Sequence, residues 1–285
     1  MNSKFHSLTK DCLLLAALAL LLAGGCTKDV DNIKLPTTDP KLVVGCFVSP
    51  QASLIAVTLT RSNPIFGPSH SNTNSSAVED ATVILTDGTN SVNIPYNNGN
   101  SQYEMSTAAF PIVAGQTYSL SVSTPKGENV SGSCTVPASS INALTVDFTD
   151  TISTNSKKIT VHWQDISGEV NFYRVIGQLV SLDTFNTLDT TFDYMYGGNL
   201  FNDHDKDGNE MYAKLEGYPS WGPDLKLIAY DVYMLNIDAE YYKYQNSLDH
   251  YTYNDPFSEP SPLYTNIKGG LGVFGAYQQL RVRFP

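Results

Sequence analysis

The sequence is poor in the residues from which catalytic, metal-binding and nucleic-acid-binding sites are most often built. Its 285 residues include five histidines, two tryptophans and four cysteines, and 17 basic residues stand against 28 acidic ones. The formal charge of -11 gives no electrostatic reason to bind a phosphate backbone, so nucleic acid is excluded as a partner. No two histidines have the spacing of a metal-ligand pair such as HxH or HExxH, and no GxSxG motif is present. We therefore expect that the protein is not an enzyme.

Long hydrophobic runs are also missing, apart from one near the start of the chain. The run from Cys12 to Ala23 has 12 residues, whereas a helix that crosses a bilayer needs about 20. Two lysines precede the run, and two glycines and Cys26 follow it, which is typical of an export signal. We therefore predict that residues 1–25 are a signal peptide and not a permanent membrane span.

The end of this segment, LLAGGC, resembles the bacterial lipobox, in which the cysteine thiol receives diacylglycerol and becomes the new N-terminus. The resemblance implies a lipoprotein in which Cys26 carries acyl chains such as palmitate. Each buried methylene would add about 0.8 kcal/mol to the attachment, so outer-membrane lipid becomes the partner of Cys26. The alternative is an ordinary signal peptide in which this cysteine has no role.

Residues 26–40 are polar and contain prolines, so we predict a lipidated and flexible tether. Lys28 is followed by Asp29 and Asp31, which resembles the export signal of surface lipoproteins of the Bacteroidota. The resemblance implies a protein of the outer membrane that is lipid-anchored at the cell surface. Removal of Lys4, Lys10 and Asp11 with the signal leaves 15 basic and 27 acidic residues, a charge of -12, which disfavours direct docking on anionic lipid.

Two cysteines remain once Cys12 is removed with the signal and Cys26 is acylated. Cys46 and Cys134 each lie an even number of positions from apolar residues of a predicted strand. Both side chains should therefore point to the same face as those residues, into a core. In an oxidising envelope they are candidates for a disulfide, which would stabilise the protein by about 4 to 5 kcal/mol in the chain-entropy model. Two reduced thiols in the core are the alternative.

Short alternating strands separated by Gly, Pro, Asn and Ser dominate the body, which predicts an all-β protein of two β-sandwich domains. The first domain, residues 41–137, contains about seven strands, with turns at Asp87-Gly88 and around Pro125-Lys126-Gly127. This pattern indicates an immunoglobulin-like or transthyretin-like sandwich.

The second predicted domain, residues 138–285, resembles a fibronectin type III sandwich. The resemblance lies in the strand of Trp163 and the following strand of Tyr173, where the tryptophan packs under the tyrosine strand. The stretch 184–225 exceeds any normal loop of such a domain, so we expect an inserted β-hairpin arm.

One helix is predicted in the second domain, in the stretch IDAEYYKYQNSLDHYTY. Asp238 is suited to the N-cap, and Tyr241, Tyr244 and later apolar residues recur at helical spacing. An aromatic stripe of this kind is typical of a core-facing surface. The chain then closes with a long strand or strand pair with glycine bends, between Val273 and Phe284.

Three segments together resemble a known family. They are YKYQNSLDHYTYNDPFSEPSPLYTNIKGGLGVFGAY, LPTTDPKLVVGCFVS and VAGQTYSLSVSTPKG. They are similar to the Bacteroidota envelope lipoprotein family catalogued as domain of unknown function 4249. The resemblance implies a lipoprotein often associated with TonB-dependent outer-membrane receptors, and it assigns no catalytic residue. The two core cysteines and the acid-rich stretch below depart from the family pattern.

The acid-rich stretch NDHDKDGNE, residues 202–210, is the main candidate site. Asp203, Asp205 and Asp207, with the glycine that follows, match the first positions of an EF-hand calcium loop, where short carboxylates converge on the cation. The twelfth position should be a glutamate, but it is Lys214. Both flanks alternate like strands instead of helices, which excludes an EF-hand.

We expect instead the tip of a hairpin with Asp207-Gly208 as its turn. Asp205 would then face Glu210, with Asp203 on the same face, and like charges directly opposite each other destabilise a hairpin. Either these side chains splay into water, or a calcium ion held by Asp203, Asp205, Asp207 and Glu210 relieves the repulsion. Such a metal site would bind weakly, with a Kd on the order of 10⁻⁴ to 10⁻³ M.

These features together predict a lipid-anchored surface binding protein of unknown molecular activity. The family resemblance implies an accessory role with a TonB-dependent outer-membrane transporter as the partner. The alternative is a calcium-assisted glycan-binding or adhesion lipoprotein, which the aromatic side chains of the second domain would allow.

Overall fold

The computed structural model describes most of the chain that follows the predicted tether. The described residues are 39–62, 77–150, 156–183, 190–197, 200–219, 225–251 and 262–285. The chain divides into two units, one of residues 1–38 with 65–68 and one of residues 39–64 with 69–285. All described residues belong to the second unit, so the predicted signal peptide and Cys26 lie outside them.

The first half of the described chain forms short strands with polar turns, as predicted. In β1 every second side chain is buried, beginning with Leu42, because alternate residues of a strand face opposite sides of the sheet. The expected turn glycines, Gly88 and Gly127, have φ values of +91° and +85°. The strands are β1 (Leu42–Val48), β2 (Leu54–Arg61), β3 (Thr82–Thr86), β4 (Ser91–Asn93), β5 (Tyr96–Asn97), β6 (Gln102–Ser106), β7 (Thr117–Ser123) and β8 (Asn129–Thr135).

The second half contains longer strands and the helix predicted after Asp238. The strands are β9 (Thr145–Asp150), β10 (Lys157–Gln164), β11 (Phe172–Asp183), β12 (Thr190–Tyr194), β13 (Tyr196–Gly197), β14 (Leu200–Asn202), β15 (Glu210–Gly217), β16 (Leu225–Ile237) and β17 (Leu271–Phe284). The helix is α2 (Ala239–Asp249). The prediction of an all-β fold is confirmed.

The described strands form three sheets that build two sandwiches. The large sheet has the order β12-β11-β16-β17-β1-β2-β6-β5, with β14 also paired to β11. The sheet β4-β3-β7-β8 packs on its β1 and β2 side around one core, and the sheet β13-β15-β10-β9 packs on its β11 and β16 side around another. The two sandwiches therefore share one continuous sheet.

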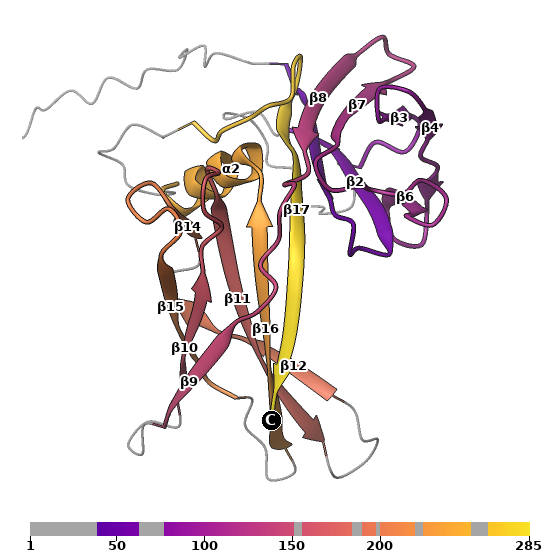
Figure 1. The fold of residues 1–285 in the computed structure, drawn as a ribbon. Coiled ribbons are helices and arrows are strands. Elements are labelled where there is room, and N and C mark those ends of the chain that lie inside the picture. Colours follow the sequence, from indigo (N-terminus) through magenta and orange to yellow (C-terminus); the bar gives the residue numbers. More distant parts are fainter. Residues whose placement is uncertain are drawn as a thin grey trace, which may run out of the picture. The chain divides into compact units, whose positions relative to one another are not determined.

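Strand β17 joins the two sandwiches. Its first part, Leu271–Ala276, pairs in parallel with β1, and its second part, Tyr277–Phe284, pairs antiparallel with β16. Figure 1 shows it in yellow, running beside β16. Phe274 is fully buried in the first core, while Phe284 packs against the second. The C-terminal strand is therefore part of both domains.

Buried amide side chains form hydrogen bonds to the linker between the two sandwiches. Asn236 donates to the Ser139 carbonyl at 2.8 Å, and Gln278 donates to the carbonyls of Pro137 and Ser139 at 2.6 and 3.2 Å. Asn236 and Gln278 are both buried, and a buried polar group is stable only when it is hydrogen-bonded. The linker that follows the first sandwich is thereby tied to β16 and β17.

The second sandwich confirms the predicted contact of Trp163 with Tyr173 but not the inserted arm. The two rings meet nearly perpendicular, with centroids 5.7 Å apart. The prediction of a hairpin arm within 184–225 is wrong, because β12 and β14 pair with β11 in the large sheet whereas β13 and β15 belong to the small one. The chain crosses between the sheets at Met195, whose buried side chain fills the space between them.

Helix α2 begins as predicted. The Asp238 carboxylate accepts a hydrogen bond from the Tyr241 N–H at 2.8 Å, the usual role of an N-cap. The aromatic stripe is core-facing only in its first turns, where the Tyr241 ring packs 4.3 Å from Phe47 of β1. Leu248 and Tyr251 are exposed, so the prediction of a buried stripe is wrong toward the end of the helix.

Substitution of Gly272 tests the dependence of the fold on β17. Gly272 has a φ of +101°, and a Cβ atom there would lie 2.0 Å from the Val44 carbonyl oxygen of β1. Gly88 has a similar φ of +91° but open space around it. We expect Gly88→Ala to lower the free energy of unfolding by about 1 to 2 kcal/mol. Gly272→Ala should cost a further 1 to 3 kcal/mol, roughly, because of the clash.

Urea unfolding followed by tryptophan fluorescence measures both changes. Equal losses for Gly272→Ala and Gly88→Ala would show that the approach of β17 to β1 does not limit stability.

The pH dependence of stability should show the effect of the raised pKa of the Asp238 carboxyl group. Burial raises its pKa from 3.8 to about 7, and the Glu240 carboxylate adds to the rise. The folded protein therefore binds a proton that the unfolded chain releases, so this contribution is full below about pH 4 and is lost as pH rises to 7. Asp238→Asn keeps an N-cap and should flatten the fall in Tm between pH 4.5 and 7.5.

Asp249→Asn, at the exposed C-terminal end of the same helix, is the control and should leave the slope unchanged. A slope in Asp238→Asn as steep as that of the unmodified protein would contradict the assignment.

Candidate functional site

The acid-rich stretch forms a turn that crosses from one sheet to the other. It follows β14 of the large sheet and leads into β15 of the small sheet. The N–H of Lys206 donates to the Asp203 carbonyl at 2.7 Å, and the N–H of Asn209 donates to the Lys206 carbonyl at 2.9 Å. The predicted hairpin tip is therefore wrong: Glu210 pairs with Gln164 of β10, and not with Asp205.

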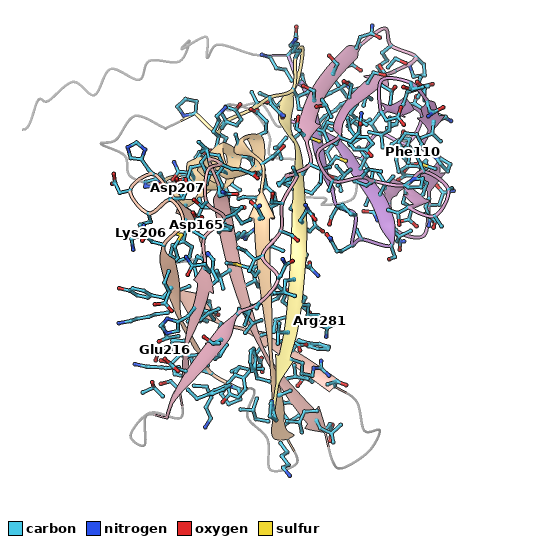
Figure 2. The ribbon with its side chains drawn as sticks, viewed as in Figure 1. Phe110, Asp165, Lys206, Asp207, Glu216 and Arg281 are labelled. Carbon is cyan, nitrogen blue, oxygen red and sulfur yellow. The ribbon has the colours of Figure 1, made fainter. Side chains whose placement is uncertain are left out.

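Three carboxylates converge at this turn, and one of them was not predicted. Oxygen atoms of Asp165, Asp203 and Asp207 all lie within 4.8 Å of one another. Asp165 and Asp203 are only 5% and 4% exposed, so two of the three carboxylates are buried. Figure 2 shows Asp165 and Asp207 near one end of the small sheet.

Two of the four predicted cation ligands belong to this cluster and two do not. Asp203 and Asp207 are members, whereas Asp205 is exposed and Glu210 has an oxygen 3.7 Å from Nδ1 of His162. The strand alternation that begins at Glu210 turns its side chain to the outer face of β15, away from the turn. The predicted ligand set is therefore corrected to Asp203 and Asp207, with Asp165 as the third member.

Asp165 is fixed by donors from two other elements. The Tyr173 hydroxyl donates to Oδ1 at 2.7 Å, and the Gly208 N–H donates to Oδ2 at 2.7 Å. Burial raises the pKa of the Tyr173 phenol, and the hydrogen bond to Asp165 raises it further. The phenol therefore stays protonated and remains a donor to the carboxylate.

The other two carboxylates each accept one backbone hydrogen bond. The Asn171 N–H donates to Asp203 Oδ2 at 2.9 Å, and the Gly168 N–H donates to Asp207 Oδ1 at 2.7 Å. Among the contacts of the described residues, the second oxygen of each carboxylate has no such donor. Carboxylate oxygens held in this way are the ligands that a hard cation such as Ca²⁺ takes.

Two hollows lie on the second sandwich, one beside the turns at residues 168–172 and 202–207 and one on the strands β10 and β15. One, of about 650 Å³, opens beside the carboxylate cluster and is lined by Val170, Phe172, Asp203 and Asp207 among others. The other, of about 670 Å³, lies on the outer face of the small sheet, with Tyr196 at its border. Both volumes lie in the range of small-molecule sites in proteins.

Sequence reasoning missed Asp165 because it is distant in the chain from the other acids. It follows β10 in the stretch QDISGE, which carries the signal of a turn but no spacing that links it to residues 202–210. The antiparallel pairing of β10 with β15 brings the two turns to the same end of the sheet. A sequence pattern does not contain that pairing.

Cys46 and Cys134 both point into the first core, as their strand positions predict. Both are buried and both are free thiols in this structure. Burial raises the pKa of the Cys46 thiol to about 12 and that of the Cys134 thiol well above its ordinary value. A raised pKa disfavours the thiolate, which is the form that reacts in disulfide exchange. The disulfide between them stays a prediction.

Comparisons with known proteins identify one family. A search of curated proteins found no match. The family model described as Domain of unknown function (DUF4249) matches residues 29–283, which include the carboxylate cluster, the outer face of the small sheet and nearly all of β17. Because this match covers most of the sequence, the chain belongs to the family Domain of unknown function (DUF4249).

Proposed function

We propose that this chain is a lipid-anchored binding protein of the outer-membrane surface that serves as an accessory to a TonB-dependent transporter. The observation that carries a binding role is the pair of open, ligand-sized hollows on the second sandwich. They lie at a turn and on a sheet face that rigid strands hold in place, and ligand sites are usually preformed concave surfaces of this kind.

The anchor is supported by the sequence that precedes the folded body. LLAGGC has the form of a lipobox, and the family match begins at residue 29, shortly after Cys26. Within the described part of the chain, no helix is both long and apolar enough to span a bilayer. Acyl chains on Cys26 would then hold the body at the surface through the polar tether.

A second candidate function is calcium-assisted glycan binding or adhesion. The observation that favours it is the convergence of Asp165, Asp203 and Asp207, two of them buried, beside a hollow. A cation at these oxygens would offset the repulsion between the three carboxylates and would fix the turn that borders the hollow.

Isolation of the tagged full chain from native outer membranes, in mild detergent, tests the transporter role. We expect one β-barrel receptor to co-purify in a fixed ratio, identified by mass spectrometry. Cys26→Ser should lose acyl labelling, leave the membrane fraction and lose the receptor. Cys12→Ser is the matched control, because this cysteine lies inside the predicted signal peptide, and it should behave like the unmodified chain.

Two results would contradict this proposal. Membrane attachment and acyl labelling that survive Cys26→Ser would remove the anchor. A membrane-attached chain that brings down no receptor in a fixed ratio would remove the transporter as the partner.

Thermal unfolding with calcium or with EDTA tests the second candidate. With a Kd on the order of 10⁻⁴ to 10⁻³ M, 10 mM calcium should stabilise the folded protein by about 1.4 to 2.7 kcal/mol. For a chain of this size the Tm should rise by roughly 3 to 10 °C above its value in EDTA. Asp203→Asn should abolish the difference because it removes one of the converging carboxylates.

Asp205→Asn is the control, since Asp205 is exposed and outside the cluster, and it should keep the full calcium shift. A Tm that is the same in calcium and EDTA would exclude the calcium-assisted function. It would leave the transporter role to be judged by co-purification alone.

A further inference from the structure

The outer face of the small sheet carries a row of side chains that crosses all four strands. Strand pairing places Thr149 of β9 beside Lys158 of β10, Lys158 beside Glu216 of β15, and Glu216 beside Tyr196 of β13. These residues line the hollow of about 670 Å³. Figure 2 shows Glu216 on this sheet, well separated along the strands from Asp207.

Two tyrosine rings border this hollow and are open to solvent. Tyr196 is 71% exposed and Tyr218 is 52% exposed, although both carry large apolar surfaces. The Tyr218 hydroxyl donates to Glu216 Oε1 at 3.4 Å, which directs its ring back toward the row. Exposed aromatic groups gathered around a hollow mark a surface for contact with a ligand.

Gly197 brings Tyr196 to this position. Its φ of +150° is strained for other residues, and a Cβ atom there would lie 2.1 Å from the Lys214 carbonyl oxygen. The missing side chain lets β13 approach β15 closely, so that Tyr196 stands directly at the edge of the hollow. The bare backbone of Gly197 also leaves that wall free of side-chain atoms.

Two of the three charged groups of the hollow, Lys158 and Glu216, form an ion pair, and the third is Lys214. Lys158 Nζ lies 3.3 Å from Glu216 Oε2, and Lys214 Nζ lies 6.0 Å from the centre of the Tyr212 ring. Hydrogen bonds from Ser156, and then from Lys158 and Tyr218, hold the pKa of the Glu216 carboxyl below its ordinary range. The hollow therefore offers donors and acceptors without a large net charge.

This combination selects a class of ligand. A sugar ring has one face of C–H groups, which packs on an aromatic ring, and hydroxyls at its edge, which need donors and acceptors. The tyrosine rings can pack on the C–H face of a sugar. Lys158, Glu216 and the hydroxyl of Thr149 can form hydrogen bonds with the hydroxyls at the edge of the sugar. The net charge of -11 opposes a polyanionic ligand.

We propose that the hollow between Tyr196 and Tyr218 is a binding site for a neutral saccharide, stacked on the two rings and hydrogen-bonded by Lys158, Glu216 and Thr149. The proposal rests on the binding role put forward above and names the ligand class. The site is separate from the carboxylate cluster, because six residues along β10 and β15, or about 20 Å, divide the two ends of the strand pair.

Titration calorimetry of the full chain in detergent tests the site. The probes are neutral oligosaccharides of the gluco, manno, galacto and xylo series, with a uronic acid oligosaccharide for comparison. We expect at least one neutral series to bind, and Tyr196→Ala and Tyr218→Ala each to weaken its affinity about three- to tenfold, the range of one aromatic contact. The uronic acid oligosaccharide should bind more weakly than the neutral ligand.

Tyr194→Ala is the matched control. Tyr194 is 62% exposed and only two residues from Tyr196, but it lies on β12 of the large sheet and outside the hollow. It should leave the affinity unchanged, and so should EDTA, because the site needs no cation. All three variants should keep the Tm of the unmodified protein, since the rings are exposed.

Three results would overturn the proposal. The first is that no neutral oligosaccharide binds. The second is that the oligosaccharide that binds the unmodified chain binds Tyr196→Ala and Tyr218→Ala with the same affinity. The third is that EDTA abolishes binding, which would assign the saccharide to the carboxylate cluster. Co-purification of the receptor with the Tyr196→Ala and Tyr218→Ala chains distinguishes a failure of the saccharide site from a failure of the transporter role. If the receptor is still captured while no saccharide binds, the ligand class fails and the accessory role stands.

Discussion

The parallel pairing of β17 with β1 is the constraint on which the rest of the structure depends. It joins residues separated by more than two hundred positions and continues directly into the antiparallel pairing of β17 with β16. The Asn266 side chain strengthens this region, because it donates to the Ser133 and Phe274 carbonyls and accepts from the Phe274 N–H. One strand therefore closes two hydrophobic cores, and the sandwiches are parts of a single body.

The candidate sites follow from this arrangement. The inner faces of β10 and β15 are covered by β11 and β16, so their side chains there belong to the core. Among the described residues of this strand pair, the outer face and the ends remain for ligand contact. The carboxylate cluster occupies one end, where turns after β10 and before β15 meet, and the tyrosine-bordered hollow lies toward the other.

Sequence patterns predicted correctly those structural features that depend on interactions between residues close together in the chain. Alternation and turn glycines placed the strands of the first half, and the N-cap Asp238 placed the start of α2, since these features depend on neighbours in the sequence. The prediction of an inserted arm was wrong for a different reason. Apolar residues alternate in β12 to β15 as they would in a hairpin, but the chain passes from one sheet to the other at Met195. Asp203 and Asp207 were found by spacing, but Asp165 comes from a different turn.

The sequence by itself determined the β character of the chain, the inward direction of Cys46 and Cys134, and its membership of a family. The tertiary structure decided which strands are neighbours, and with them the third member of the carboxylate cluster and the row across the small sheet. The reason is physical: alternation fixes the face on which a side chain lies, whereas strand pairing depends on hydrogen bonds and cores built from distant segments.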